Sequence, residues 1–148
     1  MWWTLAARIE TCVQKDKALF AMGFDFEKCF DLVPHNILMN LLREMGISER
    51  LLVPLQTLYR TLRRRWRLSK DIVGDQWVAT NGILQGCGLS VVLINALVAI
   101  WWKSLTKEAP EDCEVEGGGY ADDTHATTSK REGLDFIADH TITYASLT

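Results

Sequence analysis

The chain lacks several features that mark common classes of protein. It has only four cysteines in 148 residues, and they are far apart, without the Cys-x-x-Cys spacing of a zinc site. No secretory signal precedes them, so a disulfide framework is disfavoured as well, and we expect a reducing compartment inside the cell, the cytoplasm or the nucleus. The chain has only three prolines and a net charge of −3. Its composition, 48% hydrophobic and 24% charged, is sufficient for a globular core.

A long hydrophobic segment is missing too. The most apolar run, Gly88 to Trp102, has fifteen residues and contains Asn95, whereas a helix needs roughly 20 residues to span a membrane. We therefore expect a buried core helix from about Leu89 to Leu105, and no membrane as a partner. Internal repeats, low-complexity segments and linkers are also absent from the sequence, so residues 1–148 are expected to form a single domain or a part of a larger one.

Hydrophobic periodicity predicts an α+β fold. Residues 18–26 form a short apolar run typical of a buried strand. Helices are expected up to about residue 15, between Pro34 and Gly46, from Ser48 onwards, and over residues 131–144. Two strand-like runs, 65–69 and 76–80, flank Gly74 and Asp75 and predict a hairpin with a basic face.

Two adjacent carboxylates, Asp122 and Asp123, are the most informative residues. Asp is a poor strand former and adjacent Asp residues repel each other, so one interpretation is an ordinary turn, in which Asp is common. The other is a site for a hard divalent cation such as Mg²⁺, which takes carboxylate oxygens. A third carboxylate, Asp25, ends the apolar run 97 positions earlier (122 − 25). Three carboxylates brought together would hold two divalent ions for a phosphoryl displacement.

Three stretches, in this order, resemble the catalytic motifs of reverse transcriptases. Residues 25–35 have the D-F-x-K-x-F-D-x-V-P-H form of non-LTR retrotransposons and group II introns. Residues 81–90 resemble the second motif, the G-x-x-Q-G-x-x-L-S loop and helix, and residues 120–123 resemble the Y-A-D-D box. The resemblance covers roughly residues 18 to 130. It implies a palm-like antiparallel sheet packed on helices, with part of the fingers and no thumb.

The resemblance also implies an activity. A chain of this kind is an RNA-directed DNA polymerase, a nucleotidyltransferase that uses dNTPs, an RNA template and a DNA primer. Asp25, Asp122 and Asp123 would be its catalytic residues and its metal ligands, holding two Mg²⁺ ions with Mn²⁺ as a substitute. No specific protein partner is implied.

Substrate-binding roles follow from the same resemblance. Phe26 and the residues after it would line the triphosphate site, and Phe30 would be the steric gate that rejects a 2′-hydroxyl group. Gln85 and Gly86 would pack against the incoming nucleotide and the template base, and Tyr120 would lie beside the primer end. Each also has an ordinary alternative: a core or hairpin aromatic for Phe30 and Tyr120, a plain loop residue for Gln85, and a turn glycine with positive φ for Gly86.

A basic cluster lies between the first two motifs. By the resemblance, its arginines would contact template phosphates without reading sequence; they could equally form a solvated surface. They are Arg63, Arg64, Arg65 and Arg67. His35 is expected to pack or cap locally rather than to bind a metal.

Several departures from the family pattern keep other functions open. Gly88 and Val91 stand where the family loop has prolines, which would loosen that loop. The segment 124–129 is more polar than the usual strand after the Asp pair, so we expect it to be weakly packed or poorly formed. With little sequence before the first strand and none for a thumb, one alternative is a catalytically inactive, truncated remnant of a retrotransposon enzyme with at most weak nucleic-acid binding. An RNA-dependent RNA polymerase is a further alternative.

Overall fold

The computed structural model describes residues 2–120 and 123–147. Contacts divide the chain into two compact units. The sheet unit consists of residues 1–29 and 91–148, and the hairpin unit consists of residues 30–90. The single domain expected over the whole chain stays a prediction.

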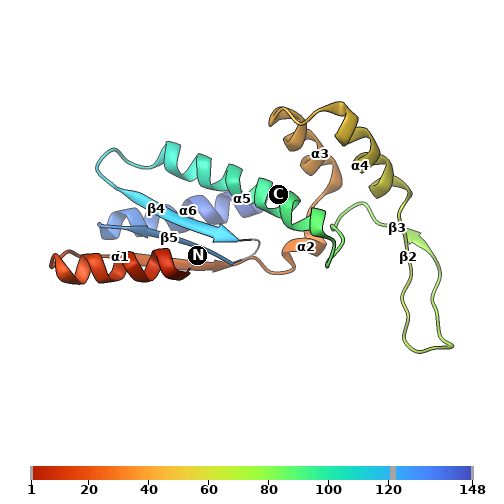
Figure 1. Cartoon of the computed structure of the whole chain (residues 1–148), viewed down its shortest axis with the longest axis horizontal. Helices are drawn as coiled ribbons and strands as arrows, with labels where there is room; N and C mark the ends of the chain where they lie inside the picture. Colours follow the sequence, from red (N-terminus) through yellow and green to blue (C-terminus); the bar gives the residue numbers. More distant parts are fainter. Residues whose placement is uncertain (1, 121–122, 148) are drawn as a thin grey trace. The chain divides into compact units, whose positions relative to one another are not determined.

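The sheet unit is built on three antiparallel strands in the order β1-β5-β4. These strands are β1 (Phe20–Asp25), β4 (Val115–Tyr120) and β5 (Asp123–Thr128). Its helices are α1 (Trp2–Gln14), most of α5 (Gly88–Glu108) and α6 (Arg131–Leu147), and they lie along the sheet in Figure 1. Strand β1 and the helices α1, α5 and α6 fall where the sequence predicts a strand or a helix, and the mixture of helices with an antiparallel sheet confirms the α+β class.

Helices α5 and α6 enclose the core of the sheet unit. Trp101 and Leu105 of α5, Ala126 of β5 and Ile137 of α6 are buried together. The Trp101 indole nitrogen donates to Thr141 Oγ1 of α6 at 3.2 Å, which ties the two helices. Burying a large apolar side chain contributes roughly 1.5–3 kcal/mol, so this cluster stabilises the packing of both helices on the sheet.

Strand β5 corrects one prediction from the sequence. The polar run after the Asp pair is expected to be weakly packed, but β5 is the central strand, paired with both β1 and β4. Five of its six residues are buried. Threonine suits this position because its branched side chain packs well on a pleated surface. In addition, Thr127 Oγ1 donates to the carbonyl oxygen of Glu116 at 3.0 Å, which satisfies a buried hydroxyl.

Glycines allow β4 to lie close to β5 and α5. A Cβ atom at Gly117 would overlap the carbonyl oxygen of His125 and stand 3.0 Å from the Trp102 ring. At Gly118 it would stand 3.6 Å from His125 Cε1, an ordinary contact distance. The first position therefore requires glycine, whereas the second does not.

Helix α5 is longer than the apolar run suggests. It has 21 residues and is long and apolar enough to cross a membrane by length and composition alone, with 33% of its most apolar window buried. The same helix supplies Trp101 and Leu105 to the core of the sheet unit. Trp101 and Leu105 thus have the core role predicted for this helix, whereas about two-thirds of its most apolar window is not buried.

The hairpin unit begins with three helices. They are α2 (Cys29–Leu32), α3 (His35–Glu44) and α4 (Glu49–Thr61). As predicted, Gly46 ends α3 with a φ of 82°, and Ser48 caps α4 by accepting a hydrogen bond from Arg50 N at 3.3 Å. The unit buries residues of α3 and α4: Leu38, Met39, Leu42, Leu52 and Tyr59.

A β-hairpin follows α4, with its turn in a different place from the prediction. Strands β2 (Arg63–Arg64) and β3 (Trp77–Val78) pair antiparallel, and the arms continue to a bridge between Arg67 and Val73. The turn is built by Ser69, whose hydroxyl accepts from Asp71 N at 3.3 Å and Ile72 N at 3.2 Å. Gly74 and Asp75, which the sequence places in the turn, belong to the second arm. Figure 1 shows both arms extending away from α4.

Candidate active site

Strands β1 and β5 bring two of the three predicted carboxylates together. Asp25 pairs with Asp123 in the register of the sheet. Directly opposite residues of an antiparallel pair point to the same face, with Cβ atoms about 4.5–5.5 Å apart. Both side chains are exposed. Like charges in this position destabilise a sheet, and a cation between the two carboxylates would relieve their repulsion.

Asp122, the third predicted ligand, lies outside the described residues together with Ala121. Tyr120 ends β4 and pairs with Asp123. Among the residues that the structure describes, no group of three His, Cys, Asp or Glu side chains is placed to hold a metal. The described part of the site is therefore the pair formed by Asp25 and Asp123.

Two aromatic side chains fix the backbone on either side of Asp25. Burial alternates along β1, so that Phe24 faces inward and Asp25 outward. The Phe24 and Phe26 rings both meet Trp101 edge-on, with ring centroids 5.6 Å and 6.4 Å from it. Trp101 thus positions the carboxylate from beneath. The sequence predicts Trp101 only as part of an apolar helix, and its link to the site could not be read from that pattern.

His125 follows Asp123 by two positions on β5 and therefore lies on the same face of the sheet. Its side chain is buried, and Nδ1 has no hydrogen-bond partner in the described part of the chain. Burial lowers the pKa of His125 because it penalises the charged imidazolium. The two-residue spacing from Asp123 is the signal in the sequence that points to His125.

In the hairpin unit, the first motif contacts the second through its backbone. Ile83 N donates to Phe30 O at 2.7 Å, and Gly82 N donates to Val33 O at 2.8 Å. Phe30 itself is half-buried, whereas Gln85 and Gly86 are exposed. Gly86 has a φ of 79°, so the turn conformation considered for it is present.

The carbonyl oxygen of Gly82 is a shared acceptor. His35 Nε2 and Arg64 Nη2 both lie 2.7 Å from it. His35 also stacks obliquely on Tyr59, with centroids 4.8 Å apart, which agrees with the packing role predicted for it. A Cβ atom at Gly82, where φ is 82°, would come within 2.8 Å of Asp31 O. Gly82 was not singled out from the sequence, since a glycine alone does not reveal its neighbours.

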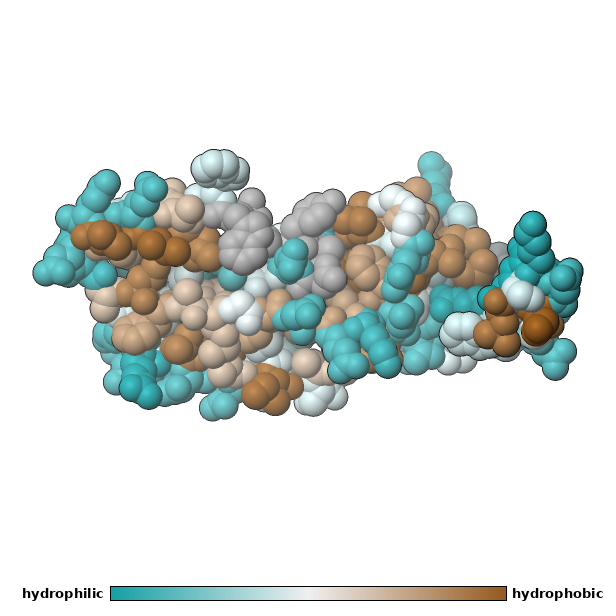
Figure 2. Space-filling model, turned by 90° about the horizontal axis from the view of Figure 1, so that it is seen from below, coloured by the Kyte–Doolittle hydropathy of each residue, from teal (hydrophilic) through white to brown (hydrophobic). Residues whose placement is uncertain are grey.

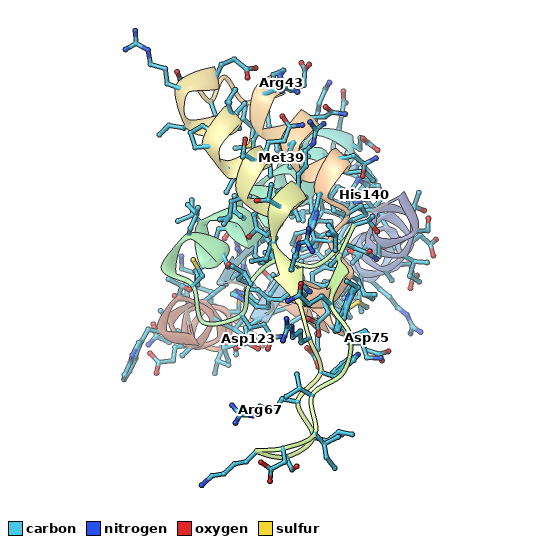
Figure 3. All side chains as sticks on the ribbon, turned by 90° about the vertical axis from the view of Figure 1, so that its right-hand side faces the viewer. Met39, Arg43, Arg67, Asp75, Asp123 and His140 are labelled. Atoms are coloured by element: carbon cyan, nitrogen blue, oxygen red, sulfur yellow. The ribbon has the colours of Figure 1, made fainter. Side chains whose placement is uncertain are left out.

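The four arginines predicted to contact nucleic acid divide into two kinds. Arg64 is half-buried and committed to Gly82 O, whereas Arg63, Arg65 and Arg67 are exposed. Figure 3 shows Arg67 on the extended part of the hairpin. Among the described residues, none of the exposed three forms an ion pair with a carboxylate. Their charges are available to an anion.

Comparisons with known proteins bear on this arrangement. A solved structure of apo telomerase from Candida tropicalis, truncated from its C-terminal domain, matches with a TM-score of 0.65 and 20% sequence identity. The match covers 93% of this chain and 30% of the telomerase chain, and at this identity it shows the fold alone. A search of curated proteins found no match.

The family model described as reverse transcriptase (RNA-dependent DNA polymerase) matches residues 3–146, nearly the whole chain. Together with the telomerase match, it confirms the expected polymerase-like fold. The chain belongs to the reverse transcriptase family.

Proposed function

We propose that this chain is an RNA-directed DNA polymerase domain, which adds dNTPs to the 3′ end of a DNA primer on an RNA template. The observation that carries the proposal is the pairing of Asp25 with Asp123 across β1 and β5, in a chain of this family. The motif forms at residues 25–35 and 120–123 support an origin in a non-LTR retrotransposon or group II intron.

The residues at this position fit a pair of divalent cations. Asp25 and Asp123 are exposed carboxylates on one face of the sheet, which is the ligand type that Mg²⁺ and Mn²⁺ prefer. Asp122 is the proposed third ligand. Bound there, two such ions would stabilise negative charge on the attacking and leaving oxygens of the phosphoryl transfer. The protein's own contribution is positioning, from Trp101 beneath β1 and from the buried strand β5.

The incoming nucleotide is proposed to contact both motifs of the hairpin unit. Phe30 is the proposed steric gate, and Gln85 and Gly86 the proposed contacts of the nucleotide and the template base. The hydrogen bond from Ile83 N to Phe30 O supports this grouping, since it holds the loop of the second motif against the first. Phe26 and Tyr120 are the proposed neighbours of the triphosphate and of the primer end.

Hydrogen bonds within the second-motif loop support an ordered loop, which the proposed nucleotide contacts of Gln85 and Gly86 require. Ser90 Oγ donates to Leu84 O at 2.5 Å, and the backbone nitrogens of Cys87 and Ser90 donate to Leu84 O and Cys87 O. Ser90 is fully buried. These bonds join Leu84, Cys87 and Ser90, which flank Gly88, one of the two positions where the family has a proline.

Primer extension with a labelled DNA primer on an RNA template tests the proposal. We expect Asp25→Asn and Asp123→Asn each to lower the rate by roughly 100-fold or more, the scale of losing one electrostatic contact to a transition state. Asp135→Asn, which removes an exposed carboxylate of α6, is the matched control and should retain the wild-type rate. Wild-type rates in Asp25→Asn would refute the assignment, and a wild-type chain that uses NTPs in preference to dNTPs would favour the RNA polymerase alternative.

A further inference from the structure

The hairpin between α4 and the second motif exposes large apolar side chains. Trp66 is 72% exposed, Leu68 83% and Ile72 58%. In Figure 2, strongly hydrophobic and strongly hydrophilic residues lie side by side on the hairpin, on the right of the view. Apolar groups gathered on an exposed surface and rimmed by polar residues mark a binding surface. The question is which partner this surface fits.

A pair of stacked indoles gives the surface a defined geometry. The Trp66 and Trp77 rings lie 5.5 Å apart between centroids, with 27° between their planes. Trp77 is only 37% exposed, so it supports Trp66 from one side and leaves the more exposed indole available. A supported aromatic face of this kind is the platform on which an unpaired nucleic-acid base stacks.

Charge on the hairpin favours a polyanion. Residues 63–78 carry five cationic side chains against two carboxylates, whereas the whole chain has a net charge of −3. Arg67 Nε donates to Ser69 O at 3.2 Å, which holds one cation near the turn. In Figure 3, Arg67 and Asp75 mark the two arms, with Arg67 on the extended part. Basic and aromatic groups are therefore interleaved along one short segment.

We propose that this hairpin binds single-stranded nucleic acid, with one base stacked on Trp66 and backbone phosphates on Arg65 and Arg67. A single strand is required because the bases of a duplex are already paired and stacked, so their faces are not available to an indole. The inference rests on the proposed function in taking the RNA template as the natural ligand. Binding itself needs neither the carboxylate pair nor synthesis.

Fluorescence anisotropy with labelled oligonucleotides tests the inference on the 148-residue chain. The probes are a single-stranded oligo(U) RNA and a blunt RNA duplex of equal length. Trp66→Ala should weaken binding of the single strand by about 5- to 150-fold, the loss of one base-stacking contact. Trp3→Ala is the matched control, since Trp3 is an 88% exposed tryptophan of α1, and it should leave the affinity unchanged.

Two further variants separate stacking from folding and from charge. Trp66→Phe keeps an aromatic face and should retain most of the affinity. If both Trp66→Ala and Trp66→Phe weakened binding equally, the loss would come from damage to the hairpin and not from lost stacking. Arg67→Gln should reduce the slope of log Kd against log salt by about 0.7, the value for one phosphate contact on a single strand.

The outcomes are distinguishable from a failure of the proposed function. Asp25→Asn should lower the rate of synthesis by roughly 100-fold or more and leave the affinity for oligo(U) unchanged. Equal affinities for Trp66→Ala and Trp3→Ala, or tighter binding of the duplex, would overturn the inference even if synthesis were normal. A third outcome would also overturn the inference. If Leu68→Ser abolished self-association and Trp66→Ala had no effect on RNA binding, the surface would bind a second copy of the chain.

Discussion

Replacing Gly117 by alanine is the sharpest test of how β4 supports the carboxylate pair. The added methyl group would overlap the carbonyl oxygen of His125, come within 3.0 Å of Ala126 Cα, and meet the Trp102 ring at 3.0 Å. Two of these neighbours are backbone atoms of β5, the strand that carries Asp123. They cannot rotate away as a flexible side chain would, so β4 has to move away from β5.

The expected cost follows from this geometry. Overpacking a well-packed core costs typically 1–3 kcal/mol, and contact with backbone atoms puts Gly117→Ala at the upper end, about 2–3 kcal/mol. For a domain of about 150 residues each kcal/mol lowers Tm by roughly 2–4 °C, which gives a decrease of about 4–12 °C. Gly118→Ala has ordinary contact distance to His125 and should be neutral or stabilise by up to about 1 kcal/mol, because alanine loses less conformational entropy than glycine.

Thermal unfolding followed by circular dichroism measures both variants against the wild type. At a temperature where all three proteins remain folded, the primer-extension rate should also fall in Gly117→Ala, because displacement of β4 disturbs the strand that carries Asp123. Tm values of the two variants within 2 °C of each other would refute the reasoning, since the same methyl group would then be accommodated equally well on both faces of β4.

Three other changes have defined outcomes. Burial lowers the pKa of His125 below its usual value of 6.5, so the unfolded chain binds a proton more readily than the folded chain. The free energy of unfolding should therefore fall as the pH drops below about 6.5. His125→Gln should flatten the dependence of Tm on pH, and an unchanged profile would contradict this. Phe30→Val should raise incorporation of NTPs relative to dNTPs, and an unchanged ratio in single-nucleotide extension would remove Phe30 as the gate. Gly82→Ala should destabilise the hairpin unit by about 1–3 kcal/mol in urea unfolding, because φ is 82° and Asp31 O lies 2.8 Å from the added Cβ atom. Gly88→Ala is the control, because no atom lies within 4 Å of a Cβ atom there.

The elements that the sequence predicts correctly are those with local signals. Gly46 and Ser48 are explicit end and start signals for helices, and the structure uses both. The convergence of Asp25 with Asp123 was also predicted, because strand order and motif spacing leave few places for the end of the first strand. These features depend on residues close in sequence or on a recognisable family pattern.

The errors lie where tertiary packing overrides local composition. The polar segment after the Asp pair is expected to be weakly packed or poorly formed, yet β5 is buried because α5, α6 and both neighbouring strands pack around it. The sequence predicts the hairpin turn at Gly74 and Asp75, because both residue types favour turns, but Ser69 closes the turn through its hydroxyl. The roles of Trp101 and Gly82 depend on neighbours far away in sequence, and no local pattern carries that information.

The pairing of β1 with β5 has a consequence for how the protein is made. Asp25 and Asp123 stand 98 positions apart (123 − 25), and contacts of such long range form late and slowly, because the entropy of closing the loop is lost before the contacts form. While the ribosome is still synthesising the middle of the chain, β1 has neither β5 beside it nor the α5 aromatics beneath it. Phe20, Met22 and Phe24 are then available to other chains as an unpaired apolar strand. Aggregation during synthesis should therefore depend on how soon residues 123–128 leave the ribosome, and slowing translation before them should lower the soluble yield.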